Sequence, residues 1–411
     1  MTFRYWYCLA AFAVPAGAQS LASLVDEALR NNREILAAQK KYESARQRPP
    51  EASSLPDPTL SLGYASNGGP WPGAGLGRDA TSNIGFAVAQ QVPFPGKRKL
   101  RGEIAQKEAD AEFEAYRSVR LSVTERLKQA YHELHHAEEA IASTQESQEL
   151  LRTILRISES RYAVGSGTQQ EIFKAQTQFS IFEAQLLRYQ QERASKEIEI
   201  NALMNRPPGG HLELEGEMAP GQLTVSLDEL VAHARTAAPA LAREQKMVER
   251  SELSANLARK GYYPDYTVSG GYFNQGGMPP MWQFRVDFQI PAYFWRKQRA
   301  EVAGEAFAVT DARHSYEAAD VSIQARIRED YAVAATARKL IDLYDKSVIP
   351  EARLALESSL TGYQTGRGDF LSVFSNFMNV VDNELMYHEE IMAFHVALAR
   401  LEEATGMELD R

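Results

Sequence analysis

The chain has 411 residues, a formal net charge of −9 and a single cysteine, Cys8. An acidic balance of this size argues against nucleic acid as a partner, because nucleic-acid-binding surfaces are usually basic. A chain with one cysteine forms no internal disulfide, and thiolate metal clusters are excluded in the same way.

The first element expected is an export signal over residues 1–18. Arg4 precedes a short apolar run, and residues 16–18 (Ala-Gly-Ala) have the small-x-small pattern of a signal-peptidase site. Cys8 lies inside this segment and does not end a lipoprotein-type signal. The apolar run is too short to span a bilayer, and no later segment reaches the roughly 18 apolar residues of a membrane helix. We therefore expect an exported protein.

The rest of the chain repeats itself. Residues 160–176 (SRYAVGSGTQQEIFKAQ) align with 361–377 (TGYQTGRGDFLSVFSNF), and residues 23–35 are echoed by 227–241. Such repeats usually record the duplication of one supersecondary unit. The order within each unit is a helix, a hairpin of strands, a long helix, a tight turn and a second long helix. We therefore place a first repeat at 19–206, a connecting segment at 207–225 and a second repeat at 226–411.

Long helices are predicted on both sides of each tight turn. Residues 97–161 contain no proline and only Gly102 as glycine, and at about 1.5 Å per residue they would extend roughly 97 Å. Apolar residues recur there and in the later helices with the alternating three- and four-residue spacing of a coiled-coil seam. Pro350 should break or kink the third long helix, because proline lacks a backbone donor. The predicted long helices are 97–161, 168–205, 296–361 and 370–406.

Alternating apolar residues predict two β-hairpins. In 282–290 (WQFRVDFQI) every second residue is apolar, over about the length that a membrane β-strand needs. Its partner is 266–273, and the first copy has strands at about 59–65 and 82–92 around a loop at 66–81 rich in glycine and proline. Half-buried strands of a soluble sheet would give the same pattern. Four strands leave open edges, which a bilayer does not tolerate, so we expect a homo-oligomer whose chains close a barrel together.

This layout resembles the TolC-like outer-membrane efflux channels, and the resemblance covers essentially all of the chain after the signal. It rests on the duplication, the two glycine turns, the openings at 28–32 (ALRNN) and 234–241, and the strand exits 90–99 (QQVPFPGKRK) and 289–298 (QIPAYFWRKQ). The resemblance implies a mainly α-helical chain with a pair of β-hairpins. Three chains would form a homotrimer with a twelve-stranded barrel in contact with outer-membrane lipid, continued by an α-helical tunnel through the periplasm.

The resemblance also gives the two glycine turns a function. In the family, the helical tips dock on a periplasmic adaptor (membrane fusion) protein, which joins the channel to an inner-membrane pump that is proton-driven. Closing a helical hairpin would by itself account for the glycines. Tyr363, Arg367 and Asp369 are predicted to form a constriction or gate at this end, although an aspartate at a turn is often only a cap. The positions carried over as adaptor-docking tips are Val164, Gly165, Ser166, Thr365, Gly366 and Arg367.

One motif favours a different function. HELHH at 132–136 satisfies H-E-x-x-H, with His132 and His136 one helical turn apart and Glu133 placed as the general base of a zinc protease. The third ligand of the extended motif is absent, and the second copy has no histidine at the equivalent positions. We therefore predict no enzyme, no catalytic residue and no metal or other cofactor, with the metalloprotease as a minor alternative.

The function expected is a passive exit duct, with energy supplied by the partner pump. No phosphate-binding loop of the G-x-x-x-x-G-K-[ST] type occurs in the chain, so nucleotide should not drive transport. The exit PFPGKRK (93–99) resembles the branch that serves cobalt–zinc–cadmium and copper–silver pumps, which favours heavy-metal cations as cargo. Some relatives carry an acidic ring at positions that are Ser372 and Ser375 here, with Asp369 as the nearest substitute. The alternatives are a drug or secretion duct of the same architecture and a non-channel periplasmic coiled-coil scaffold.

Overall fold

The computed structural model describes residues 19–67, 69–216 and 218–409, so the predicted export signal lies outside the described residues. The chain divides into two compact units. Among the described residues, unit 1 comprises those within 19–36, 119–234 and 324–409, and unit 2 comprises those within 37–118 and 235–323. Each unit therefore takes a part from both predicted repeats.

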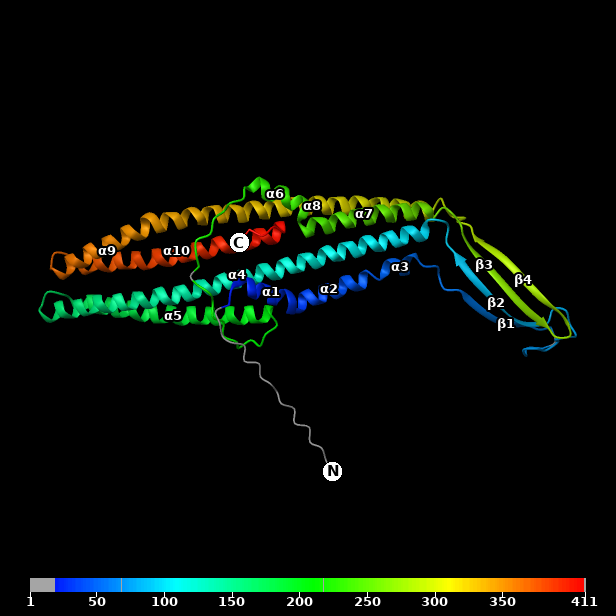
Figure 1. Cartoon of the computed structure of the whole chain (residues 1–411), viewed down its shortest axis with the longest axis horizontal. Helices are drawn as coiled ribbons and strands as arrows, with labels where there is room; N and C mark the ends of the chain where they lie inside the picture. Colours follow the sequence, from blue (N-terminus) through cyan, green and yellow to red (C-terminus); the bar gives the residue numbers. More distant parts are fainter. Residues whose placement is uncertain (1–18, 68, 217, 410–411) are drawn as a thin grey trace, which may run out of the picture. The chain divides into compact units, whose positions relative to one another are not determined.

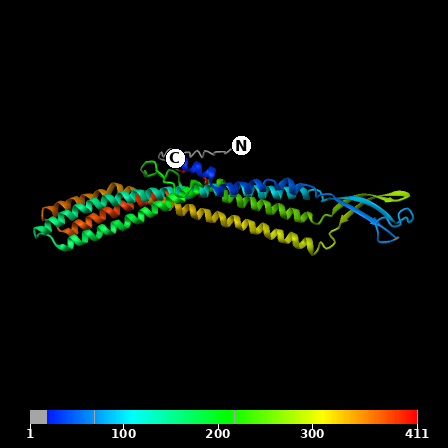
Figure 2. The ribbon, with the colours of Figure 1, turned by 90° about the horizontal axis from the view of Figure 1, so that it is seen from below.

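Unit 1 consists mainly of two helical hairpins, which lie side by side in both ribbon views (Figure 1, Figure 2). The first joins the end of α4 (Lys97–Ala163) to α5 (Gln169–Leu203), and the second joins α9 (Ile349–Gln364) to α10 (Phe370–Thr405). Their apolar faces meet in one core, where the rings of Phe182 and Phe377 pack edge to face. The buried core residues are Leu151, Ile154, Ala175, Phe182, Leu356, Tyr363, Phe370, Val373, Phe374, Phe377, Val380 and Val381.

The third long helix passes Pro350 without ending. α8 (Lys297–Leu343) is followed by a π-helical turn, η1 (Tyr344–Val348), and α9 continues from there with Pro350 in its first turn. Proline cannot donate the backbone hydrogen bond that an α-helix requires, and a π turn rearranges the bonding pattern locally. The disturbance lies where the sequence predicts it, but it takes the form of a wider helical turn instead of a break.

Both copies open with a pair of helices separated by one residue. In the first copy Asn32 makes this break: its Oδ1 accepts hydrogen bonds from the backbone amides of Glu34 (2.8 Å) and Ile35 (3.2 Å), and its Nδ2 donates to the carbonyl of Leu203. In the second copy Ala238 makes the break, before Pro239. None of the described helices has both the length and the hydropathy needed to cross a bilayer. The shorter helices are α1 (Leu21–Asn31), α2 (Arg33–Ala45), α3 (Arg48–Ser53), α6 (Leu227–Ala237) and α7 (Pro239–Lys260).

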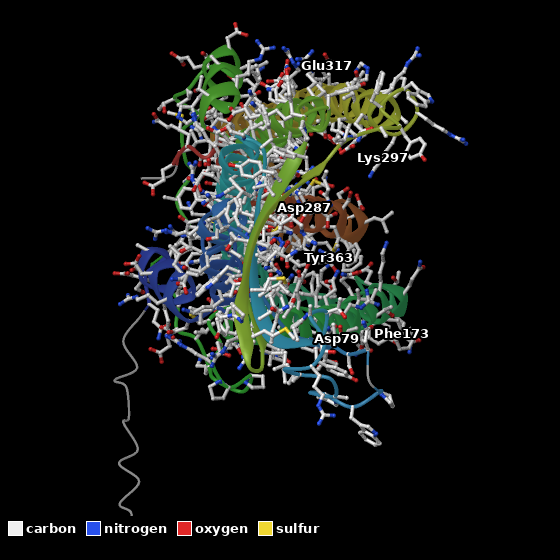
Figure 3. All side chains as sticks on the ribbon, turned by 90° about the vertical axis from the view of Figure 1, so that its right-hand side faces the viewer. Asp79, Phe173, Asp287, Lys297, Glu317 and Tyr363 are labelled. Atoms are coloured by element: carbon white, nitrogen blue, oxygen red, sulfur yellow. The ribbon has the colours of Figure 1, made fainter. Side chains whose placement is uncertain are left out.

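Unit 2 contains a four-stranded antiparallel sheet in the order β1-β2-β3-β4 (Figure 1). Its register brings Leu62, Phe86, Tyr272 and Trp282 into one row across all four strands. Because opposed residues share a face, the alternating apolar residues of every strand gather on one side of the sheet, and most of them are exposed. The opposite face has most of the polar residues of the sheet and carries the ion pair between Arg285 and Asp287, the latter labelled in Figure 3. The strands are β1 (Thr59–Ala65), β2 (Asn83–Val92), β3 (Asp265–Gln275) and β4 (Met278–Gln289).

The second hairpin is tighter than the sequence predicts. We expected a loop from Asn274 to Met281, whereas β4 already begins at Met278 and only Gly276 and Gly277 form the turn. Gly276 has a left-handed φ of +74°, which suits a two-residue hairpin loop. The two prolines that follow are tolerated because the register of β3 and β4 shifts between Phe273 and Gln275, so that neither Pro279 nor Pro280 has a partner in the ladder.

A largely buried ion pair fixes the start of α4 in unit 2. Lys97 Nζ lies 2.8 Å from Asp265 Oδ1 and donates a second hydrogen bond to the carbonyl of Tyr263. The same Asp265 oxygen accepts a hydrogen bond from the backbone amide of Phe94 (2.7 Å). The two charged side chains are only 9% and 18% exposed, so removal of one would leave the other charge poorly solvated.

Replacement of Lys97 by methionine should lower the free energy of unfolding of unit 2 by about 3–5 kcal/mol, because Asp265 loses its buried counter-ion. Hydrogen exchange of the β2 and β3 amides would measure this loss. The matched control is Lys99→Met, since Lys99 is exposed and pairs only loosely with Glu103; its effect should stay below about 1 kcal/mol. Equal effects of the two substitutions would contradict the assigned role of Lys97.

Candidate functional site: the two helical tips

The two tips have the same backbone structure. Gly165 and Gly366 adopt left-handed φ angles of +75° and +73° at the end of α4 and α9. In the Schellman type of helix ending, a glycine has a left-handed φ angle. The amide of the residue after it donates a hydrogen bond to a carbonyl of the last helical turn. A side chain at either glycine would strain this conformation. The closing bonds run from the amide of Ser166 to the carbonyl of Arg161 and from the amide of Arg367 to the carbonyl of Gly362, both 2.8 Å.

The crest of each tip, which is residues 164–166 in the first and 365–367 in the second, is open to its surroundings. A Cβ atom built on Gly165 would meet no atom within 4 Å, and one on Gly366 would meet only the Arg161 guanidinium at 3.8 Å. The flanking residues predicted as docking positions are all exposed: Val164, Ser166, Thr365 and Arg367. The structure therefore presents six equivalent, accessible positions, three from each copy.

A second glycine closes each turn from the inside. A Cβ at Gly167 would lie 3.1 Å from the backbone nitrogen of Tyr162, and one at Gly368 would lie 3.1 Å from the carbonyl carbon of Gly362. These glycines are needed for close backbone approach, whereas Gly165 and Gly366 are needed for their φ angle. Hairpin closure thus explains all four glycines, and the exposed crest is an additional property.

Tyr363 joins the second tip to the first. Its side chain is only 1% exposed (it is labelled in Figure 3), and its hydroxyl donates a 2.7 Å hydrogen bond to Glu171 of α5. The same hydroxyl lies 3.1 Å from Ser158 Oγ of α4. Burial and the neighbouring Glu171 carboxylate raise the pKa of Tyr363, so the phenol stays protonated and can donate. One buried side chain thus ties the second hairpin to both helices of the first.

Arg161 completes this tie from the first hairpin. Its guanidinium lies 4.5 Å from the centre of the Tyr363 ring, and it donates hydrogen bonds to the carbonyls of Tyr363 (2.5 Å) and Ser166 (3.2 Å). A cation over an aromatic face adds electrostatic attraction to the hydrogen bonds. Sequence analysis missed Arg161 because the second copy has Gly362 at the equivalent position. The only signal was that asymmetry beside two otherwise matching turns.

The three residues predicted for a constriction have different environments. Asp369 is the N-cap of α10, and its carboxylate accepts hydrogen bonds from the Ser372 amide (2.9 Å) and hydroxyl (2.8 Å), which lower its pKa. Arg367 is exposed. Tyr363 is buried, so in this conformation it cannot line a passage and instead ties the hairpins together. Only Arg367 and Asp369 are available to face a passage.

The residues of the HELHH motif are engaged in packing. Glu133 accepts a hydrogen bond from Gln129 (2.8 Å) and forms an ion pair with Lys196 of α5 (2.5 Å). His132 is buried and stacks on His395. Across 19–67, 69–216 and 218–409, the histidine, cysteine, aspartate and glutamate side chains form no group of three or more that could hold a metal ion. A carboxylate held by lysine is poorly placed to act as a general base.

A groove of about 770 Å³ lies beside η1 in unit 1. It runs between α4 on one side and η1, α9 and α10 on the other. One cation in its wall, Arg353, is already bound to Glu384 at 2.6 Å. The groove therefore has a negative potential that would attract cations. Its acidic lining residues are Glu139, Glu146, Asp345, Glu357 and Glu384.

Comparison with known proteins shows which family this architecture resembles. Residues 24–206 match the model of the outer membrane efflux proteins. SilC of Salmonella typhimurium, a probable outer membrane lipoprotein, is 21% identical over 383 residues, which cover 89% of this chain and 79% of SilC. The chain is therefore similar to the outer membrane efflux proteins over residues 24–206. Its class is that of TolC-like outer-membrane channels, and family and fold are those of passive channels rather than enzymes.

Solved structures share the fold over nearly the whole chain. VceC from Vibrio cholerae superimposes with a TM-score of 0.79 at 17% identity and covers 94% of this chain and 96% of its own. CusC, whose crystal structures concern folding and transmembrane channel formation, gives a TM-score of 0.77 at 16% identity and covers 94% and 91%. The predicted fold class, long helical hairpins with a small antiparallel sheet, is confirmed. The trimer and its closed barrel stay predictions.

Removal of one hydroxyl should loosen the tips. In Tyr363→Phe the ring still fills the core, but the hydrogen bond to Glu171 is lost, which should cost about 1–2 kcal/mol. Hydrogen exchange of amides in residues 155–175 and 358–375 would report this as faster local opening. The matched control is Tyr162→Phe, because Tyr162 is the equivalent residue of the first copy and is 48% exposed. If hydrogen exchange became faster by a comparable amount in both variants, the Tyr363 hydroxyl would not be what links the two hairpins.

Proposed function

We propose that this outer-membrane efflux channel is the exit duct of a tripartite system, that its two tips dock on a periplasmic adaptor protein, and that its cargo is heavy-metal cations. The adaptor would connect it to a proton-driven inner-membrane pump, which supplies the energy. The observation that carries the docking assignment is the pair of equivalent glycine crests, open to their surroundings and built on hairpins that are tied together.

The crests suit a helical partner. Glycine leaves the backbone uncovered, so another helix can pack against the turn without meeting a Cβ atom. Val164 adds a small exposed apolar contact, and Arg367 adds a positive charge at the other crest. Two matching crests within one chain would give the adaptor two nearly equivalent contacts per subunit.

The sheet supports assembly into a trimer. Within the chain's sheet, β1 and β4 are each paired on one side only, and the apolar residues of one face are exposed. Unpaired strand edges are satisfied when neighbouring chains continue the sheet, and an exposed apolar face suits the hydrocarbon of a membrane. Three copies of four strands would close the twelve-stranded barrel that the family resemblance implies.

The metal assignment is supported by sequence similarity and by charge. CusC has the same fold and SilC is a relative of this chain, and the exit sequence at 93–99 resembles the heavy-metal branch. The acidic groove beside η1 and the ionised Asp369 favour cations over anions. A fold does not determine its cargo, so a drug or secretion duct of the same architecture is the second candidate.

Bulky substitutions at the crests test the docking assignment. Gly165→Trp and Gly366→Trp should abolish efflux while trimers still form and reach the outer membrane, since the side chain would project from the crest into the space the partner needs. Efflux and trimer abundance in the outer-membrane fraction are measured together. Two controls are needed: Gly209→Trp, at another glycine with open space around it, and Gly165→Ala, which strains the turn without filling the space. Survival of transport in both tryptophan variants would mean that the tips are not the docking site.

Growth of a deletion strain, with and without the gene restored, tests the cargo. The panel contains copper, silver, zinc, cobalt and cadmium salts together with drugs and detergents. Selective metal sensitivity that the gene rescues is the expected result. Sensitivity to drugs alone would keep the channel and overturn the metal assignment. No phenotype in any condition, despite trimers in the outer membrane, would count against efflux itself.

A further inference from the structure

A buried pair of histidines links two helices of unit 1. His132 of α4 and His395 of α10 stack with ring centres 4.7 Å apart and planes inclined by 17°. His132 is only 4% exposed, and neither of its ring nitrogens has a hydrogen-bond partner among the described residues. A neutral imidazole already leaves one N–H unpaired in such a place, and an imidazolium would leave two together with a buried charge.

The same histidines hold the connecting segment, residues 207–225, of which residue 217 is not described. His395 Nε2 lies 2.9 Å from the carbonyl oxygen of Ala219, to which it donates. Gly221 rests directly on α10, because a Cβ there would lie 2.5 Å from Phe394 and 3.3 Å from His395. Near His135, one turn along α4 from His132, the backbone of Glu215 acts to raise the pKa of the ring, although burial lowers that pKa overall. The connecting segment is therefore fastened to the bundle through histidines.

The charges around His132 oppose its protonation. Burial lowers its pKa well below the usual range, and nearby His395, Lys128 and His135 act in the same direction. On α10, Glu402 faces this region, but its carboxylate is already bound to Lys128 at 2.6 Å. The Tyr131 ring packs edge-on against both His132 and His135. From the connecting segment, Glu215 contributes its backbone to His135 and its charge acts on Tyr131.

We propose that the stacked pair of His132 and His395 is an acid-sensitive clasp that releases the connecting segment from α4 and α10 when His132 takes up a proton. His132 is a positioning residue in this device. It holds the His395 ring in place, and that ring holds Ala219. A protonated His132 can find acceptors only by leaving its site or by admitting water, and either movement breaks the stack.

The direction of the pH effect follows from linkage. In the released state His132 has an ordinary pKa of about 6.5, whereas the fastened state binds the proton only at much lower pH. The released state therefore binds more protons below pH 6.5, and acid favours release. At pH 5.0 the equilibrium constant for release should rise by up to about 30-fold over its value at pH 7.5.

Hydrogen exchange of the full-length channel at pH 7.5 and pH 5.0 tests the clasp, after correction for the intrinsic pH dependence of exchange. We expect the amides of residues 218–225 to lose protection at pH 5.0 in the wild-type protein. His132→Phe keeps a ring that stacks but does not titrate, so this acid effect should largely disappear. The matched control is His314→Phe, because His314 is an exposed histidine of unit 2, and it should keep the wild-type behaviour.

Two results would overturn the proposal. One is equal protection of residues 218–225 at both pH values in the wild-type protein. This test does not depend on the folding of any variant. The other is a His132→Phe protein that retains the full acid effect. Gly221→Ala provides a positive control, because the added methyl group would collide with Phe394 and should release the segment at both pH values.

Discussion

The fold of unit 1 depends on the packing of one helical hairpin against the other. A hairpin of two long helices with coiled-coil spacing has an apolar stripe that it cannot bury alone. The second hairpin supplies the partner: Leu151, Ile154 and Phe182 of the first hairpin are buried against Val373, Phe374 and Phe377 of the second. This contact determines where the tips lie relative to each other, so the two glycine crests form one site only because the core beneath them is shared.

The two copies are equivalent in backbone but not in burial. Tyr162 and Tyr363 occupy the same place in the repeat, yet the first is exposed and the second is fully enclosed. The difference comes from the residues that surround each ring, since Arg161, Ser158 and Glu171 all belong to the first hairpin and all contact Tyr363. The two turns are similar in sequence and backbone, and the different flanking residues make one of them the attachment point of the other.

The sequence was most informative where the physical signal is local. Alternation in 282–290 predicted the apolar face of β4, and glycine spacing predicted both tips, because φ preference and periodicity act over a few residues. Side-chain contacts between distant segments of the chain could not be predicted, for the opposite reason. Lys97 meets Asp265 and His132 meets His395 across long stretches of chain, and no pattern near either partner indicates the other. The early start of β4 and the π turn before Pro350 are smaller departures, where pairing and packing overrode a proline signal.

The surfaces left exposed indicate two kinds of surroundings. On the sheet, the exposed side chains are large and apolar and form continuous rows, among them Leu62 and Trp282. Such an area is costly in water and gains from an apolar medium that needs no specific shape. At the crests the exposed surface is small and combines glycine backbone with the side chains of Val164, Ser166, Thr365 and Arg367. Such a surface gains less from an apolar medium than from a partner of complementary shape. The chain thus presents a lipid type of surface in unit 2 and a protein type of surface in unit 1, which is the combination that a membrane-anchored duct requires of its subunit.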